Sequence, residues 1–418
     1  MADSDHSIYD ERGIPTVING VGTRTQVSGS RLRPEAREAM HRASEEYVYM
    51  TDLQAHASDR IAAVTGSEAG IVTAGTAAAL TLATAASIAG DDYDTMTALP
   101  HHDGPTDVVI PRAHRCKYSP AFRAGGASLV EVGPVSHHPV NGGVDAVDPW
   151  RIASAIGPET VAVAYLSRPY NRLSLETVVD VAHDHDVPVI VDAADDTFPP
   201  ARMRRLLATG ADLVAFSGGK RIRGPQSTGI LAGRTDLIRS AAVQMLSDGY
   251  DPSVWSPPSS FIDPEAYPGV PPTGIGRGMK VAKEDILGLL AALDAYLEED
   301  HVAVHRSNER IAERIAERLQ RDQGNDSRIA SVRIETNDPP ESATDSDIGG
   351  MPAVVVRFDN PSDTATDVVR ELRTQSPRVW VGESHLHLNE VTISPQCLDE
   401  EEADILVDRL ITASSVSG

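Results

Sequence analysis

One stretch, residues 211–231 (ADLVAFSGGKRIRGPQSTGIL), constrains the fold of this chain more than any other. The short run 212–216 has the length and β-branched character of a buried strand, and it ends at Ser217-Gly218-Gly219. Two glycines free the backbone to present the next side chain, Lys220, at the open end of a sheet. A surface lysine in a glycine turn is the alternative interpretation.

Lysine is scarce in this chain, which favours a chemical role for Lys220. The sequence holds four lysines, at 117, 220, 280 and 283, and its other basic side chains are arginines. Arginine cannot supply a primary amine, so a lysine retained at a strand end is typical of a residue that bonds covalently to a ligand.

A second strand precedes the first by about one βα unit. In VPVIVDAADD (187–196), an apolar run leads to Asp192 at the expected carboxyl end of the strand. Ligands of open α/β sheets bind at these ends. A pyridoxal phosphate enzyme needs such a pair, because the lysine binds the cofactor covalently and the aspartate keeps the pyridine nitrogen protonated.

The segment 69–90 supplies a candidate phosphate site. A short strand, 69–73, runs into Ala74-Gly75-Thr76 and then into a helix rich in alanine and leucine. Free N–H groups and the hydroxyl of Thr76 at a helix N-terminus favour an anion. The same 22 residues carry no charge, but they are rich in Ala, Thr, Gly and Ser and have acids on both sides, so we expect a buried helix and no membrane span.

With these motifs in place, the chain resembles the fold-type I pyridoxal phosphate enzymes. Within that superfamily it is similar to the group of bacterial selenocysteine synthase (L-seryl-tRNA selenium transferase) and D-glucosaminate-6-phosphate ammonia lyase. The matching segments, in chain order, are residues 17–32, 49–80, 114–133, 173–194, 217–231 and 274–293. The most specific strings are SGGKRIRGPQ (217–226) and GRGMKV (276–281).

The resemblance implies a fold and a set of site residues. The expected fold class is α/β, the fold-type I transferase fold, with a mostly parallel sheet in a large domain and a smaller α+β C-terminal domain. Lys220, Asp192 and His114 are the implied catalytic residues, with the imidazole of His114 against the ring of pyridoxal 5'-phosphate. Cofactor contacts are implied for Gly75, Thr76, His114, Asp192, Ser217 and Lys220. Substrate contacts are implied for Arg24, Tyr118, Arg223, Gln226 and Arg277.

We expect three regions along the chain: an arm with one helix at 1–45, the large cofactor domain at 46–282 and the small domain at 283–418. Residues 91–106 and 336–350 are predicted to be polar loops, 247–279 a loop at the site or an interface, 283–321 one long helical stretch, and 385–389 (HLHLN) a strand. Arg33 is a second arginine of the arm that we expect either to meet a substrate anion or to be solvated.

Charge and cysteine content narrow the partners. The formal charge is −24 and the pI is near 4.9, which with scarce lysine favours a protein from a salt-accumulating halophile and argues against nucleic acid as a partner. Cys116 and Cys397 lie far apart without metal spacing, so we predict no metal site. The polar first residues lack a signal core, so we expect a cytoplasmic protein with no membrane contact.

The sequence thus predicts a homodimer or higher homo-oligomer that binds a small-molecule amine and acts as a lyase on an amino acid or amino sugar acid. The product would arise by loss of ammonia or of a β-substituent. A selenium transferase acting on seryl-tRNA is the alternative enzyme, and a relative without catalysis is disfavoured by the presence of Lys220 and Asp192. Asp195-Asp196 and Arg168-Pro169-Tyr170 depart from the family pattern and leave the substrate open.

Overall fold

The chain forms two compact units. The large unit is Leu32–Glu299, and the small unit combines Met1–Arg31 with Asp300–Gly418. The computed structural model describes residues 7–134, 147–168, 171–246, 251, 253–267, 269–270, 274–323, 327–336, 350–359 and 364–415.

The boundaries between the two units follow Arg31 and Glu299 and differ from the predicted domain limits, residues 45 and 282. Helix α2 (Pro34–Ala43) packs on α11 (Lys283–Glu298), and Gly288 of α11 lets the side chain of Met40 approach closely. Both helices therefore belong to the large unit. The arm strand β1 (Val17–Gly20) pairs instead with β11 (Arg378–Val381) in the small unit.

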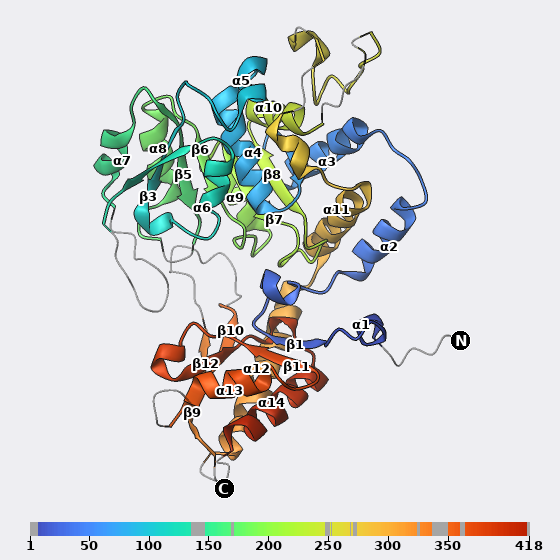
Figure 1. The fold of residues 1–418 in the computed structure, drawn as a ribbon, viewed down its shortest axis with the longest axis vertical. Coiled ribbons are helices and arrows are strands. Elements are labelled where there is room, and N and C mark those ends of the chain that lie inside the picture. The colour runs from blue at the N-terminus through green and yellow to red at the C-terminus, as the bar shows by residue number, and fades with distance from the viewer. Residues whose placement is uncertain are drawn as a thin grey trace. The chain divides into compact units, whose positions relative to one another are not determined.

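A sheet of seven strands, in the order β2-β8-β7-β6-β5-β3-β4, runs through the large unit (Figure 1). The strands are β2 (Ala69–Thr73), β3 (Asp107–Pro111), β4 (Ser128–Val132), β5 (Thr160–Leu166), β6 (Val189–Asp192), β7 (Leu213–Ser217) and β8 (Gly229–Gly233). Only β8 runs antiparallel to its neighbours, β2 and β7, and the other pairs are parallel. The predicted α/β class with a mostly parallel sheet is confirmed.

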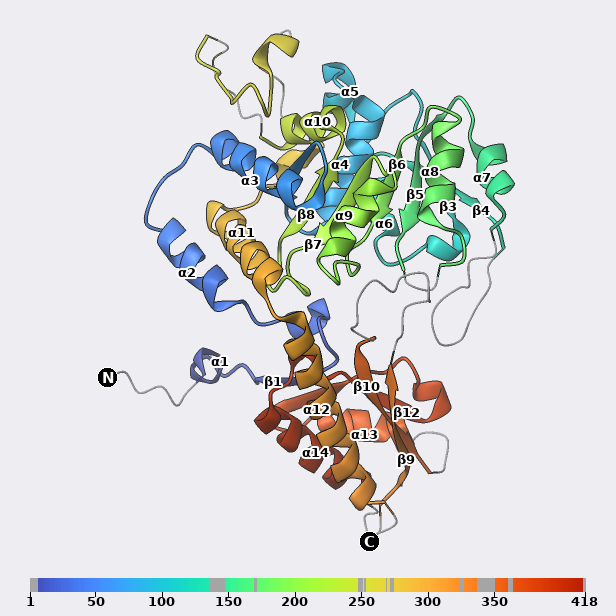
Figure 2. The same cartoon turned by 180° about the vertical axis from the view of Figure 1, so that it is seen from behind.

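Helices cover both faces of this sheet (Figure 2). One core joins the sheet to α3 (Met50–Thr65), α7 (Pro149–Ala155), α8 (Leu175–His183), α9 (Ala201–Ala208) and α11. The other joins it to α4 (Thr76–Ala89), α5 (Tyr93–Ala98), α6 (Ser119–Ala124) and α10 (Thr235–Leu246). Because successive strand residues point to opposite faces, Ile71 enters the second core and Val72 the first.

The uncharged segment after Gly75 forms the buried helix α4, as predicted. Its threonine hydroxyls are satisfied inside the helix, since Thr84 Oγ1 donates to Leu80 O at 2.8 Å and Thr81 Oγ1 to Ala77 O at 3.0 Å. Among the described residues, none of the helices combines the length and the hydropathy that a bilayer span requires.

The small unit is an α+β arrangement. A second sheet has the antiparallel order β12-β10-β9, with β9 (Ile329–Thr336), β10 (Pro352–Phe358) and β12 (Glu390–Ile393). The helices are α1 (Ile8–Glu11), α12 (His301–Arg321), α13 (Thr364–Leu372) and α14 (Glu400–Ser414). The short 3-10 turns among the described residues of the chain are η1 (Thr25–Val27), η2 (Arg112–His114), η3 (Pro264–Ala266), η4 (Ile275–Met279), η6 (Leu386–Leu388) and η7 (Pro395–Cys397).

Three local predictions were wrong. The predicted loop 91–106 contains α5, whose N-terminus is capped by Asp92. The stretch 283–321 is two helices, because the chain breaks after α11 and Asp300 caps α12. The alternating 385–389 segment forms η6, and Asn389 ends it in the left-handed region at φ 57°. Most of the predicted loop 336–350 and parts of 247–279 lie outside the described residues.

Candidate functional site

The carboxyl ends of β2, β6 and β7 open on one edge of the large sheet. Thr73 and Ser217 are each paired with Gly229, the first residue of the antiparallel β8, and Asp192 is paired with Ala215 of β7. This register brings the segments that follow β2, β6 and β7 to the same edge. These segments begin the helix α4, the 193–198 loop and the Lys220 loop respectively.

Asp192 is a buried carboxylate at this edge. It is 2% exposed, its Oδ1 accepts the N–H of Ala194 at 3.1 Å, and Cys116 Sγ lies 3.7 Å from its Oδ2. Burial raises the pKa of Asp192, and the Ala194 hydrogen bond and the charge of Lys220 offset this only in part. Burying an anion is unfavourable without a cation nearby, so the position suits a cationic partner.

Lys220 lies in a tight loop after β7. Gly218 donates to Thr228 O at 2.9 Å, and Gly224 donates back to Gly218 O at 2.9 Å, which closes the loop. A Cβ on Gly219 would lie 2.6 Å from Gln226 Cα, so only glycine fits just before the lysine. The Lys220 side chain is 15% exposed, and its Nζ lies 3.7 Å from Asp195 Oδ2.

The N-terminus of α4 is an anion site at the same edge. Gly75 is its N-cap at φ 89°, no side chain caps it, and Thr76 at the first helical position is buried. Gly229 allows the close approach of this turn, because a Cβ there would lie 2.5 Å from Gly75 C. The N–H groups of the first turn and the helix dipole favour a phosphate group.

His114 and Tyr118 extend the site toward β5. His114 is 2% exposed, its Nδ1 accepts the N–H of Leu166 at 3.3 Å, and its ring meets Tyr165 edge to face at 4.6 Å. Leu166 is paired with Asp192, so His114 contacts the strand beside that carboxylate. Burial raises the pKa of the Tyr118 hydroxyl, and Asp192 and Asp195 raise it further. Tyr118 is therefore a neutral hydrogen-bond donor near both carboxylates.

The predicted substrate residues divide into two groups. Arg223 and Gln226 lie in the Lys220 loop, beside the site. Arg277 is exposed on η4, which packs on α4 and α10, and Arg24 is exposed in the small unit as the N-cap of η1. The structure thus brings Tyr118, Arg223 and Gln226 toward Lys220 and Asp192, and the substrate roles of all five stay predictions.

Sequence reasoning missed several partners. The carboxylate of Asp196 is held by Ser167 Oγ at 2.6 Å and by Arg202 Nε at 3.0 Å, whereas Asp195 pairs with Lys220. The two adjacent acids therefore have different surroundings, which no local pattern reveals. Pro169 and Tyr170 of the other departure lie outside the described residues.

The contacts of Cys116 and Arg33 were not predicted from the sequence either. Burial and the nearby Asp192 raise the pKa of the Cys116 thiol, so it stays protonated as a weak donor. Arg33 is neither solvated nor at a substrate position, because it is buried and hydrogen-bonded inside the large unit. Within the described segments, no three metal-ligating side chains come together.

Comparison with known proteins gives this arrangement a class. The model of the aminotransferase class-V family matches residues 148–251, the part of the sheet that carries Asp192 and Lys220. The 5'-C-glycyluridine monooxygenase-decarboxylase of a Streptomyces species is 30% identical over 416 residues, covering 96% of this chain and 90% of that protein. The chain belongs to the pyridoxal phosphate-dependent enzymes of fold type I.

Two further relatives lie within the group that the sequence motifs indicated. D-glucosaminate-6-phosphate ammonia lyase of Salmonella typhimurium is 26% identical over 419 residues, 97% of each chain. A solved structure of an enzyme of that name covers 98% of both chains, with a TM-score of 0.73 and 25% identity. The L-seryl-tRNA(Sec) selenium transferase of Nitratidesulfovibrio vulgaris is 25% identical over 284 residues, 56% of this chain and 55% of that one.

The residues at the edge fit pyridoxal phosphate, the cofactor of this class. The buried Asp192 would provide an anion for the ring nitrogen, the N-terminus of α4 would provide N–H groups for the phosphate, and Lys220 would provide the amine. When bound, the cofactor withdraws electrons from a bond that breaks in the substrate. The predicted cofactor is confirmed by the class, while the individual contacts remain predictions.

Proposed function

We propose that this protein is a lyase that acts on a small amine with an anionic group, an amino acid or amino sugar acid, and releases ammonia or a β-substituent. The observation that carries the proposal is the match of an ammonia lyase to nearly the whole chain, in sequence and in fold. A match over both units supports a shared architecture around the substrate, beyond the shared cofactor.

The side chains at the edge supply the groups that an elimination requires. Lys220 is an amine at the carboxyl end of β7 and can take a proton from carbon and deliver one to a leaving group. Asp195 stabilises positive charge on that amine when it carries the proton, since its carboxylate lies 3.7 Å away. Tyr118 stays neutral and can donate a hydrogen bond to the substrate.

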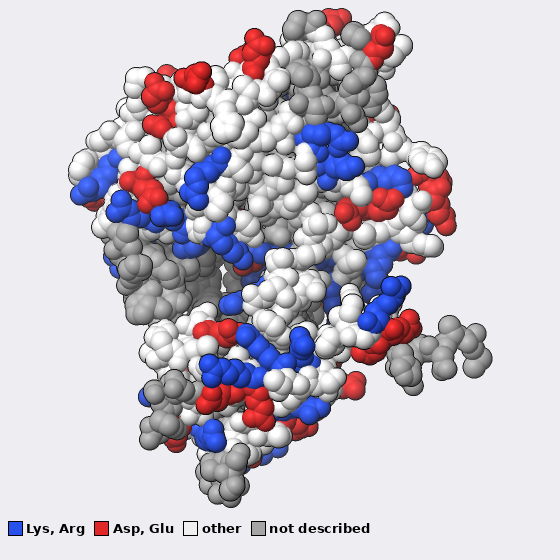
Figure 3. Space-filling model, viewed as in Figure 1, with Lys and Arg blue, Asp and Glu red and all other residues white. Residues whose placement is uncertain are grey.

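A selenium transferase acting on seryl-tRNA is the second candidate, and the partial match to such enzymes favours it. The charge of the chain argues against it. A formal charge of −24 repels a polyanion at low salt, and at high salt the release of counterions drives binding only weakly. On the face of the molecule in Figure 3, Lys and Arg side chains lie in separate groups with Asp and Glu beside them.

A turnover panel tests the proposal. The holoenzyme is incubated with amino acids, amino sugar acids with and without phosphate, and a glycyl nucleoside, and ammonia and carbon dioxide are measured. We expect ammonia from at least one amino acid or amino sugar acid, and none with Lys220→Ala. Carbon dioxide without ammonia would overturn elimination in favour of a decarboxylase.

A tRNA titration separates the second candidate. It is run at several salt concentrations beside the same panel, and changes in the visible cofactor band are recorded. Tight, salt-sensitive tRNA binding, with no change of the band by any small amine, would overturn the lyase in favour of the transferase.

A further inference from the structure

Arg33 makes several buried contacts next to the Lys220 loop. It lies just before α2 and is 6% exposed. Its Nη1 and Nη2 donate to the two carboxylate oxygens of Glu299 at 2.8 and 2.9 Å, and its guanidinium lies 5.7 Å from the ring centroid of Tyr296. We call these three residues the Arg33 cluster. A bidentate pair of this kind fixes orientation as well as charge.

The Arg33 cluster is bonded directly to the loop that carries the lysine. Arg33 Nε donates to Ile222 O at 2.8 Å, two residues after Lys220. The backbone N–H of Arg33 donates to Arg223 O at 3.0 Å. Arg223 has φ 60°, a left-handed conformation that is strained for a residue with a side chain and persists where neighbours hold it. Arg33 donates two of the hydrogen bonds that hold this part of the loop, one to Ile222 O and one to Arg223 O.

The same cluster reaches the loop that carries Asp195. Tyr296 is 1% exposed, and its hydroxyl donates to Thr197 O at 2.9 Å. Burial raises the pKa of Tyr296 to about 12, so this donor stays protonated. Arg221 adds a second link between the two loops, since its guanidinium lies 5.0 Å from the ring centroid of Phe198. The Lys220 loop and the 193–198 loop therefore share one anchor.

The Arg33 cluster lies next to both points at which the chain enters or leaves the large unit. The chain passes between the compact units after Arg31 and after Glu299. Arg33 and Glu299 therefore lie within two residues of the two crossings, and their ion pair joins the crossings inside the large unit.

We propose that the Arg33 cluster is a positioning device for the cofactor lysine, which sets the Nζ atom of Lys220 relative to Asp195 and Asp192. In this role it would act through the backbone of the Lys220 loop. This inference depends on the class of the enzyme and holds equally for a lyase or a transferase.

Two substitutions separate positioning from simple charge neutralisation. Arg33→Lys keeps a cation beside Glu299 but cannot bond both carboxylate oxygens and Ile222 O in the same geometry. Glu299→Gln keeps the shape and removes the charge. The matched control is Arg234→Gln, which breaks a pair with the buried Asp212 (2.9 Å) just before β7, at the opposite end of the strand from Lys220.

The readouts separate a local effect on the Lys220 loop from a loss of global stability. Hydrogen exchange of peptide 218–226 is measured in the cofactor-free protein and compared with a peptide from β5. The cofactor dissociation constant, the pH midpoint of the visible cofactor band, kcat and KM are measured on the holoenzyme.

We expect faster exchange in 218–226 but not in β5 for both cluster variants. We also expect cofactor affinity to fall about tenfold, the band midpoint to shift, and kcat to fall about tenfold to a hundredfold with little change in KM. Arg234→Gln should match the wild type within about twofold in each of these. Wild-type exchange, cofactor affinity and band midpoint in both cluster variants would overturn the proposal, whatever their melting temperatures.

A milder variant covers the case in which the charge variants fail to fold. Tyr296→Phe removes one hydroxyl and the hydrogen bond to Thr197 O. We then expect faster exchange in peptide 193–200 and a cofactor affinity below that of the wild type. If both stay at the wild-type values, the cluster does not position the site.

Discussion

Two ion pairs with nearly the same geometry have different surroundings in the two units. In the large unit, Arg33 Nη1 lies 2.8 Å from Glu299, and the two side chains are 7% and 20% exposed. In the small unit, Arg318 Nη1 lies 2.9 Å from Asp404, and the side chains are 27% and 33% exposed. The two N–O distances are nearly equal, but the side chains of the small-unit pair are more exposed to solvent.

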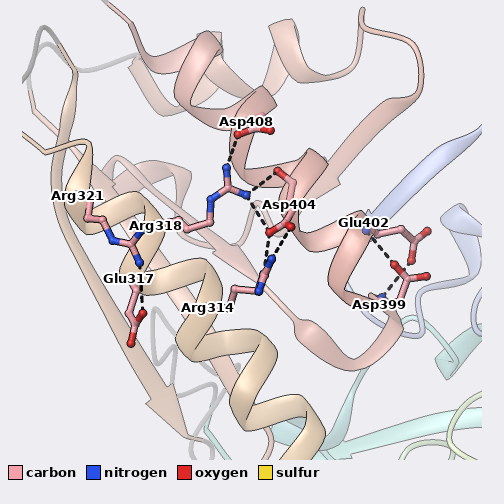
Figure 4. Close-up of polar contacts among 8 residues, drawn as sticks. All are labelled: Arg314, Glu317, Arg318, Arg321, Asp399, Glu402, Asp404 and Asp408. Carbon is pink, nitrogen blue, oxygen red and sulfur yellow. Dashed lines mark hydrogen bonds and ion pairs between the residues drawn. The ribbon is translucent and has the colours of Figure 1, made fainter.

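The small-unit pair belongs to a surface network between α12 and α14 (Figure 4). Arg314 and Arg318 both bond Asp404, and Arg318 also bonds Asp408. Such exposed pairs contribute roughly 0–1 kcal/mol each and weaken as salt screens them. A buried pair contributes mainly by fixing where neighbouring groups lie, and losing one partner leaves the other charge unpaired. Burial, and not distance, therefore decides what an ion pair does in this molecule.

The largest expected effect is at the interior amine. Lys220→Ala should abolish the covalent link to the cofactor, which borohydride reduction followed by peptide mapping detects in the wild type. Turnover should fall by about 10³-fold or more, because alanine supplies no amine at the end of β7. Retention of a borohydride-stable adduct at Lys117, Lys280 or Lys283 with wild-type turnover would show that another amine does the work.

The next effect is at the buried carboxylate. Asp192→Asn keeps the shape but cannot stabilise a positive ring nitrogen, so we expect turnover to fall by about 10²-fold or more with an intact fold. Circular dichroism and kcat for the best substrate of the panel measure both. Asp404→Asn, at the surface, is the control and should leave kcat unchanged.

The third effect concerns the whole acidic surface. With a formal charge of −24, self-repulsion should lower the melting temperature in dilute buffer. Raising salt from about 0.1 M to about 1 M shortens the screening length from about 10 Å to about 3 Å and should raise the melting temperature. Thermal unfolding at a series of potassium chloride concentrations tests this, and a flat or falling curve would remove the halophile hypothesis without affecting the site.

The smallest effect is the acid response of the surface network. Hydrogen bonds from Arg314 and Arg318 lower the pKa of Asp404 to about 2. A lowered folded-state pKa means that the contribution is present above the unfolded value of about 3.9 and is lost as the pH falls toward 2. Asp404→Asn should therefore lower the free energy of unfolding by less than about 1 kcal/mol at pH 7.

The pH series provides the control for that prediction. The difference between wild type and Asp404→Asn in urea unfolding should stay constant from pH 7 to about pH 4 and shrink below it. A difference that grows on acidification would mean that another group, and not the Asp404 carboxylate, carries the interaction.

The parts of the fold that could be predicted from the sequence are those marked by a local pattern of apolar residues. The strand 69–73 has the predicted bounds, because a strand buried on both faces is a continuous run of small and apolar residues between turn residues. The HLHLN segment shows the limit of this reasoning. Its alternation resembles a strand, but Asn389 bonds Phe358 O and Ala365 N, which fixes a turn instead.

The candidate site was predictable where a side chain follows a strand end. Lys220, Asp192 and Gly75 lie at one edge because β2, β6 and β7 end there, which topology requires. Contacts between distant positions were not predictable, since Arg33 and Glu299 are 266 residues apart in the chain. Nothing local distinguishes a buried arginine from a solvated one.

The scarcity of lysine has a practical consequence for chemical labelling. Lys117 and Lys280 are exposed, whereas Lys283 is half-buried and donates to Ala43 O at 2.6 Å. If Lys220 binds the cofactor as predicted, its amine becomes unavailable to an acylating reagent when the cofactor is bound. The mass that such a reagent adds to the tryptic peptide 206–221, normalised to labelling at Lys117 and Lys280, would therefore report the fraction of molecules that carry cofactor in any preparation, without a substrate and without an absorbance standard.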